Sequence, residues 1–243
     1  MNEVFTLWLG KTNHVSRKCM RSWKQLGYKV IVYTNIDHHD HFLDKYEIRD
    51  YRTILNLPVT ELLPFSDLFR YRRLFREGGI WIDADMYLLK RLPEDDIIIS
   101  SERCCKTGAF KRAIDHIPNI GVLKFPKNDH LIAATIRKIE SSRAKNNKII
   151  KNMQVFQNLI LKKFVEYQPF VSLPEDYCPV NWSNCKDIYY STEFKSKYGK
   201  DVNQIDEILD ESIGVHLWGN FTINKHKIDF SRVENGSLFS MLK

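Results

Sequence analysis

The chain has 243 residues, with 37 lysines and arginines against 30 aspartates and glutamates, so its formal net charge is +7. Hydrophobic residues make up 43% and charged residues 28%, which is typical of a globular protein and argues against a disordered tail or a disulfide scaffold. The longest wholly apolar runs, such as 97–99 and 159–161, fall far short of the roughly 18 to 20 residues that span a bilayer. We expect a single α/β domain over residues 1–243.

The N-terminus and the cysteines both favour a cytoplasmic protein. Residues 1–5 lack a basic stretch followed by an apolar segment and a cleavage site, so no secretory signal is expected. The five cysteines form an odd set without the C-x-x-C spacing of a zinc site: Cys19, Cys104, Cys105, Cys178 and Cys185. Reduced thiols are therefore expected. The positive charge suits an anionic ligand such as a nucleotide, a nucleic acid or an acidic membrane surface.

The first 35 residues predict the opening of an α/β domain. The expected elements are a strand, a helix and a second strand, over residues 5–9, 15–26 and 28–33. Gly10, Gly27 and Asn35 lie at their ends. Parallel strands present their C-terminal ends to a ligand, so we expect Trp8 and Asn35 at the ligand edge of the sheet.

Residues 66–79 predict a helix that carries an acid and a base one turn apart. Ser66 is a favourable N-cap, and the pair Gly78 and Gly79 ends the helix. Asp67 suits the positive end of the helix dipole, and Arg70 lies three residues further on, so the two are neighbours on one face. The alternative to a ligand site is an ordinary ion pair at the start of a helix.

Two carboxylates interrupt the apolar run that follows. Residues 80–82 predict a buried strand that continues through Asp83 and Asp85 into residues 86–89. In an extended segment both carboxylates point to the same side, which disfavours the pair unless a cation lies beside them. Because about 0.7 Asp-x-Asp patterns are expected by chance in such a chain, the apolar flanks and the preceding helix supply the specificity. A polar turn between two strands is the alternative.

The second half of the chain predicts two packing helices, over residues 129–142 and 153–167, and a strand-like run over 213–221. His216 lies within that run and Asn220 near its end, and the two compete as candidate metal ligands. A lone histidine in an apolar run is more often a core residue. Asn119 could contact a ligand, but turn chemistry explains it equally well.

A basic face is expected on the helix before the Gly-Gly pair. Arg72, Arg73 and Arg76 predict a solvated basic surface, with peripheral association at the inner face of a membrane as the alternative.

The stretch from Ser66 to Tyr71, together with that from Gly78 to Asp85, resembles metal-dependent retaining glycosyltransferases that contain a DXD sugar-binding segment. That group includes initiating α1,6-mannosyltransferases, α1,4-galactosyltransferases and capsular polysaccharide enzymes, and more distantly the large clostridial glucosylating toxins. Residues 8–10 and 216–218 support the resemblance, whereas residues 102–212 match only loosely.

The resemblance implies a GT-A architecture, which is a Rossmann-like nucleotide-sugar-binding sheet flanked by helices. It implies that Asp85 ligates Mn²⁺ or Mg²⁺ with His216 or Asn220, and that Asp83 contacts the donor and helps hold the metal. Trp8 would stack on the base, and Trp218 would lie against the diphosphate. The implied donor-binding residues are Leu7, Trp8, Asn35, Asp67, Arg70, Tyr71 and Asp83. The implied catalytic residues are Asp83, Asp85 and Trp218.

The expected activity is transfer of a hexose, with retention, to a glycan or lipid-linked acceptor in polysaccharide biosynthesis. A UDP-sugar is favoured as donor over GDP-mannose. One alternative is another metal enzyme with paired carboxylates that acts on nucleotides, such as a nucleotidyltransferase or phosphohydrolase. The second is a non-enzymatic basic protein that binds nucleic acid or an anionic surface, which the aspartates disfavour because they would repel a polyanion. No nucleic-acid partner is expected.

Overall fold

The computed structural model describes residues 3–103, 116–146, 152–191, 205–219, 223 and 225–243. The described strands are β1 (Glu3–Leu7), β2 (Lys29–Thr34), β3 (Glu47–Asp50), β4 (Gly79–Ile82), β5 (Met86–Leu88), β6 (Ile98–Arg103), β7 (His116–Phe125) and β8 (Gly214–His216). The described α-helices are α1 (His14–Gln25), α2 (Leu62–Glu77), α3 (His130–Asn146), α4 (Asn152–Lys162), α5 (Pro174–Tyr177), α6 (Asp187–Tyr190), α7 (Ile205–Glu211) and α8 (Leu238–Met241). Short 3-10 turns occur at η1 (His41–Lys45), η2 (Tyr51–Thr53), η3 (Val165–Phe170), η4 (Trp182–Asn184) and η6 (Phe230–Arg232).

A six-stranded sheet with the order β3-β2-β1-β4-β7-β6 forms the centre of the protein. β1 pairs in parallel with both β2 and β4, so that Phe5 lies opposite Ile31 on one side and Trp81 on the other. Only β7 runs against its neighbours β4 and β6. The expected α/β class, with a mostly parallel sheet flanked by helices, is therefore confirmed.

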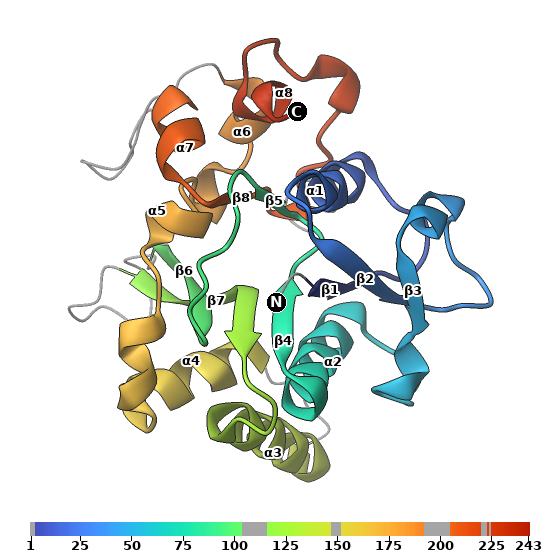
Figure 1. The fold of residues 1–243 in the computed structure, drawn as a ribbon, viewed down its shortest axis with the longest axis vertical. Helices are drawn as coiled ribbons and strands as arrows, with labels where there is room; N and C mark the ends of the chain where they lie inside the picture. Colours follow the sequence, from blue (N-terminus) through green and yellow to red (C-terminus); the bar gives the residue numbers. More distant parts are fainter. Residues whose placement is uncertain (1–2, 104–115, 147–151, 192–204, 220–222, 224) are drawn as a thin grey trace.

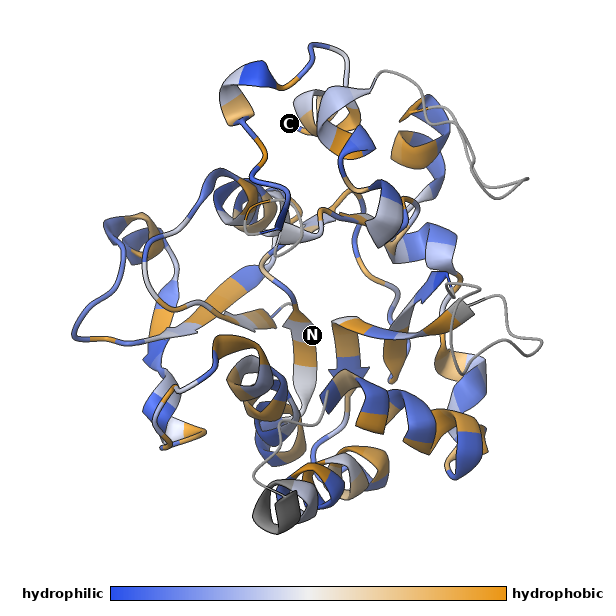
Figure 2. Ribbon diagram, turned by 180° about the vertical axis from the view of Figure 1, so that it is seen from behind, coloured by the Kyte–Doolittle hydropathy of each residue, from blue (hydrophilic) through white to orange (hydrophobic). Residues whose placement is uncertain are grey.

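Helices cover both faces of this sheet (Figure 1). α2, α3 and α4 lie on one face, while α1 and the short helices α5 to α8 lie on the other with the small sheet of β5 and β8. Neighbouring residues of β1 serve opposite faces, since Val4 packs into the α1 side and Phe5 into the α2 side. The central strands β1, β2 and β4 are mostly apolar, whereas the helices carry both apolar and polar residues (Figure 2).

The helix expected from Ser66 starts four residues earlier. α2 begins at Leu62, its N-cap Glu61 makes no side-chain capping bond, and Ser66 lies inside the helix. Pro64 is tolerated in the first turn because the N–H group that it lacks would have no partner within the helix. The predicted end is confirmed, since Gly78 and Gly79 both adopt positive φ, at 68° and 99°.

The downstream elements differ from expectation in length. The predicted helix over 153–167 ends at Lys162 and is followed by the 3-10 turn η3. Within the described part of the strand expected over 213–221, which ends at residue 219, only β8 is a strand, and it pairs antiparallel with β5. None of the helices in the described ranges has the length and apolar character needed to cross a bilayer. Among the cysteines, Cys19, Cys178 and Cys185 are buried and free, while Cys104 and Cys105 lie outside the described residues.

The predicted basic face on α2 is wrong for Arg73. This side chain is buried, with its guanidinium 4.1 Å above the ring of Phe5. It donates to the Tyr33 hydroxyl at 2.8 Å and to the Gly78 carbonyl at 2.9 Å, and it pairs with Glu77 at 3.2 Å. Its charge therefore stabilises the junction between α2 and the sheet and does not face solvent.

Adjacent arginines on α2 provide a matched test of this difference. We expect Arg73→Ala to lower the free energy of unfolding by about 3 kcal/mol, because it removes one member of a buried hydrogen-bonded pair. Arg72→Ala breaks only a half-exposed pair with Glu140 and is expected to lower it by less than about 1 kcal/mol. Urea unfolding of both variants measures the two values. Equal losses would contradict the buried role of Arg73.

Candidate functional site

A cavity of about 530 Å³ opens at the C-terminal ends of β1 and β4. Leu7 and Trp8 reach it from the end of β1, and Asp83 from the end of β4. α2 contributes Asp67 and Arg70 to its wall. Of the two residues expected at this edge of the sheet, Trp8 lines the cavity and Asn35 is not in its described lining.

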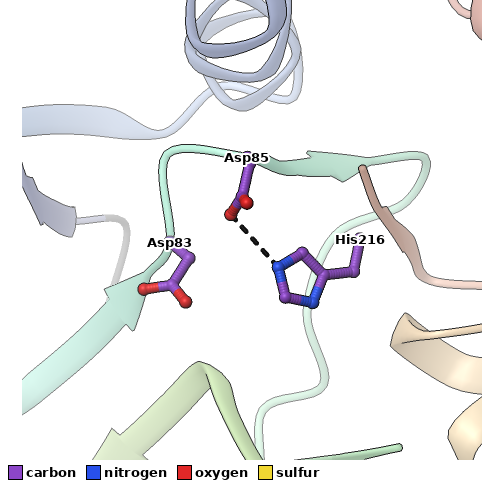
Figure 3. Close-up of side chains that lie close together, drawn as sticks. All are labelled: Asp83, Asp85 and His216. Atoms are coloured by element: carbon purple, nitrogen blue, oxygen red, sulfur yellow. Dashed lines mark hydrogen bonds and ion pairs between the residues drawn. The ribbon is translucent and has the colours of Figure 1, made fainter. Parts of the chain in front are cut away.

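Asp83, Asp85 and His216 form a cluster beside this cavity (Figure 3). One ligand atom from each lies within 4.8 Å of the other two, and His216 Nε2 is 3.2 Å from Asp85 Oδ1. The expected extended backbone at 83–85 is wrong, because the Met86 N–H donates to the Asp83 carbonyl at 2.9 Å and closes a turn. The turn still brings both carboxylates to the same place, and β5 pairing puts Met86 opposite His216.

The segment after β8 closes around Asp85. The Gly219 N–H donates to Asp85 Oδ2 at 2.6 Å. A Cβ atom on Gly219 would lie 3.0 Å from the Asp85 Cβ atom, so this close approach favours glycine. Trp218 adopts a φ of 52° and stacks on the His216 ring with centroids 4.0 Å apart. Its indole N–H donates to the Val180 carbonyl at 2.8 Å, which fixes the ring behind the histidine.

A buried guanidinium holds Asp83 from the other side. Arg70 Nη2 lies 2.8 Å from Asp83 Oδ1 and 3.6 Å from Asp67 Oδ1, and Nη1 donates to the Ile120 carbonyl at 2.6 Å. Trp81 lies 4.7 Å below the guanidinium, and its indole N–H donates to the same Asp83 oxygen at 2.7 Å. Arg70 therefore positions a carboxylate of the cluster in addition to facing the cavity.

Asp83, Asp85 and His216 shift one another's pKa values. Burial raises the pKa of Asp83, with Arg70 opposing the shift. Burial would also raise the pKa of Asp85, but the charge and hydrogen bond of His216 lower it. Burial acts to lower the pKa of His216, and the neighbouring Asp85 carboxylate more than reverses that effect. Asp85 and His216 therefore stabilise each other's charged forms.

The donor set fits a divalent cation. Two carboxylate oxygens and an imidazole nitrogen suit Mn²⁺, and the carboxylates alone suit Mg²⁺. Four carboxylates line the cavity, those of Glu61, Asp67, Asp83 and Asp85, and Arg70 is the one cationic residue among its described lining. Because this lining carries more negative than positive charge, it favours a bound cation. An anionic ligand is disfavoured there unless a cation accompanies it.

The other predicted residues lie farther from the cavity. Asn35 is outside the described lining, and its side chain accepts from the Asp37 N–H in a turn. Tyr71 is fully buried against Phe156. His216 and Trp218 lie behind Asp85, and Asn220 falls outside the described residues. Asn119 is buried and donates to Glu102 at 2.7 Å.

Sequence reasoning assigned no role to several residues that complete the site. Trp81 supports Asp83, Gly219 supports Asp85, and Cys178 contacts His216. The glycine that follows His216 and Trp218 was a usable signal, because a glycine often marks close approach of the backbone. Cys178 lies 38 residues from His216, and no sequence spacing marks that contact.

The titration of Asp67 gives a test of this geometry. Burial raises its pKa from 3.8 to about 6, with Arg70 opposing and Asp83 reinforcing the shift. A raised carboxyl pKa contributes stability that is complete below the unfolded value of 3.8 and is lost as the pH rises through 6. Measured in EDTA, the stability of the native protein relative to Asp67→Asn should therefore be greater at pH 4.5 than at pH 8. A difference independent of pH would show that Asp67 is not buried as described.

Residues 11–104 match the family model described as "Glycosyltransferase sugar-binding region containing DXD motif". A search of curated proteins found no match. Among solved structures, "PaToxG Glycosyltransferase" is 17% identical with a TM-score of 0.46, over 70% of this chain and 68% of that chain. The apo-form glycosyltransferase GlyE of Streptococcus pneumoniae TIGR4 is 15% identical with a TM-score of 0.40, over 72% and 45%. The ligand-free glycosyltransferase domain from the YGT toxin is 10% identical with a TM-score of 0.40, over 99% and 81%. The matched segment contains α2 and the Asp-x-Asp turn, so this part of the chain is similar to the sugar-binding region of DXD glycosyltransferases.

Proposed function

We propose that the protein transfers a hexose from a nucleoside diphosphate sugar to a glycan or lipid-linked acceptor, with retention of configuration. UDP is the favoured nucleotide, and Mn²⁺ or Mg²⁺ is the cofactor. The observation that carries the proposal is the Asp83, Asp85 and His216 cluster beside a cavity whose wall holds Asp67 and Arg70. A volume of about 530 Å³ lies within the range of small-molecule sites.

The chemistry requires stabilisation of a leaving group more than a strong nucleophile. Breaking the bond between sugar and phosphate leaves negative charge on the diphosphate, which a bound divalent cation stabilises. Asp85 and His216 would hold that cation, with Asp83 beside them. In the retaining reaction that we propose, the acceptor hydroxyl attacks from the side of the leaving group, and its proton passes to the departing phosphate oxygen.

The cavity wall would bind the two ends of the donor. Asp67 and Arg70 lie one helical turn apart and offer an acceptor and a donor to the sugar hydroxyls. Arg70 is already held by Asp83 and the Ile120 carbonyl, so its position is set before the sugar binds. Trp8 lines the cavity next to the end of β1 and would stack on the base.

Release of the nucleotide from a panel of donors tests the proposed function. We expect one UDP-sugar to be hydrolysed slowly in the presence of Mn²⁺ without acceptor, with UDP as the product and with complete loss of activity in EDTA. Asp85→Asn should abolish this activity, and Asp96→Asn, which changes an exposed aspartate, should leave it unchanged. Release of pyrophosphate or inorganic phosphate would instead indicate a nucleotidyltransferase or phosphohydrolase. The anomeric configuration of a transferred sugar, read by NMR, tests retention.

A second test concerns the proposed stacking of the nucleotide base on Trp8. We expect Trp8→Ala to weaken UDP binding by roughly 10- to 100-fold, because stacking of a base on an aromatic ring contributes about 1 to 3 kcal/mol. Trp8→Phe retains an aromatic face and should recover most of that affinity. Calorimetric titration of UDP with Mn²⁺ present measures both variants. If Trp8→Ala binds UDP as tightly as the native protein does, the indole does not stack on the base.

A further inference from the structure

The His216 imidazole has a different partner at each nitrogen. Nε2 faces Asp85 Oδ1 at 3.2 Å, and Nδ1 lies 3.8 Å from the Sγ atom of Cys178. Both His216 and Cys178 are buried, and Cys178 directly follows α5, on a segment distant from the Asp-x-Asp turn. The ring is also confined by Trp218, stacked at 4.0 Å, and by Gly121, where a Cβ atom would lie 3.7 Å from His216 Cε1.

Metal binding and the ion pair with Asp85 require different protonation of His216 Nε2. In the pair with Asp85, Nε2 carries a hydrogen and donates it to the carboxylate. A metal at Nε2 requires the lone pair there, so that the neutral ring must carry its hydrogen on Nδ1. The partner of Nδ1 must then accept a hydrogen bond, and it must also accept one when the ring is charged beside Asp85, because both ring nitrogens then carry a hydrogen.

A thiol can serve in both states, because its sulfur is a weak acceptor. An aliphatic side chain at this place could serve in neither. We propose that Cys178 is a positioning residue that orients His216 and holds its hydrogen on Nδ1, so that Nε2 is free to bind the divalent cation. The inference rests on the proposed function, since it assigns a supporting role in the same metal site.

The test measures binding of Mn²⁺ and not turnover. We expect Cys178→Val to weaken Mn²⁺ binding by about 10- to 100-fold, as loss of a partner that orients a metal-bound histidine does. Cys178→Ser should retain most of the affinity, because a hydroxyl also donates and accepts. Cys185→Val is the matched control, since it changes another wholly buried cysteine that no described bond connects to His216. Calorimetry gives the affinities, and thermal unfolding shows whether the two valine variants are equally stable.

Pulsed EPR of bound Mn²⁺ supplies a signature that a purely structural role would not change. The native protein and Cys178→Ser should show coupling to an imidazole nitrogen, and Cys178→Val should show weaker coupling. Native affinity together with native nitrogen coupling in Cys178→Val would overturn the proposal, and so would equal losses in Cys178→Val and Cys185→Val. If Cys178→Val does not fold, loss of the nitrogen coupling in a folded Cys178→Ser overturns it.

The native protein separates this inference from the proposed function. Mn²⁺ bound tightly without nitrogen coupling would overturn the role of Cys178, while metal-dependent donor hydrolysis would remain to support the proposed function. Failure to bind Mn²⁺ together with failure to hydrolyse any donor would overturn the metal-dependent function itself.

Discussion

The burial of the Arg70 guanidinium constrains the whole site. A charge that is 3% exposed must be matched by nearby carboxylates and hydrogen-bond acceptors, or the fold loses several kcal/mol. Asp83 supplies the closest carboxylate, Asp67 a second, and the Ile120 carbonyl an acceptor on β7. One side chain therefore connects α2, the end of β4 and the antiparallel strand β7, and it fixes where the first aspartate of the pair can lie.

The second aspartate is satisfied in a different way. Asp85 faces His216 and the Gly219 N–H, both from the segment that returns beside β5. The two carboxylates thus have separate cationic partners, a guanidinium from α2 and an imidazole from β8. A permanent charge holds Asp83, whereas the charge beside Asp85 can leave as a proton.

Local patterns in the sequence were sufficient to predict the sheet edge and the helix that carries Asp67 and Arg70. Gly78 and Gly79 marked the end of α2, because only glycine adopts their positive φ without strain. The start of α2 was misplaced because Ser66 is a good N-cap in isolation, whereas the helix begins at Leu62, an exposed residue that no local capping signal precedes.

The remaining parts of the site depend on contacts that local sequence does not encode. Burial of Arg73 requires Phe5 and Tyr33 from two other strands, and nothing in the arginine-rich stretch itself distinguishes Arg73 from Arg72. The turn at Asp83 arises because β4 belongs to the large sheet and β5 to the small one. The contact between Cys178 and His216 forms only when two distant segments pack together.

The pairing of β5 with β8 also determines when the site can exist during synthesis. Asp85 and His216 are separated by 131 residues, and such non-local contacts form late because the intervening chain must first be ordered. A ribosome-bound chain that has exposed only the DXD segment would contain both aspartates and the arginine but would lack the imidazole. The cluster of Asp83, Asp85 and His216 can therefore form only after translation has passed β8.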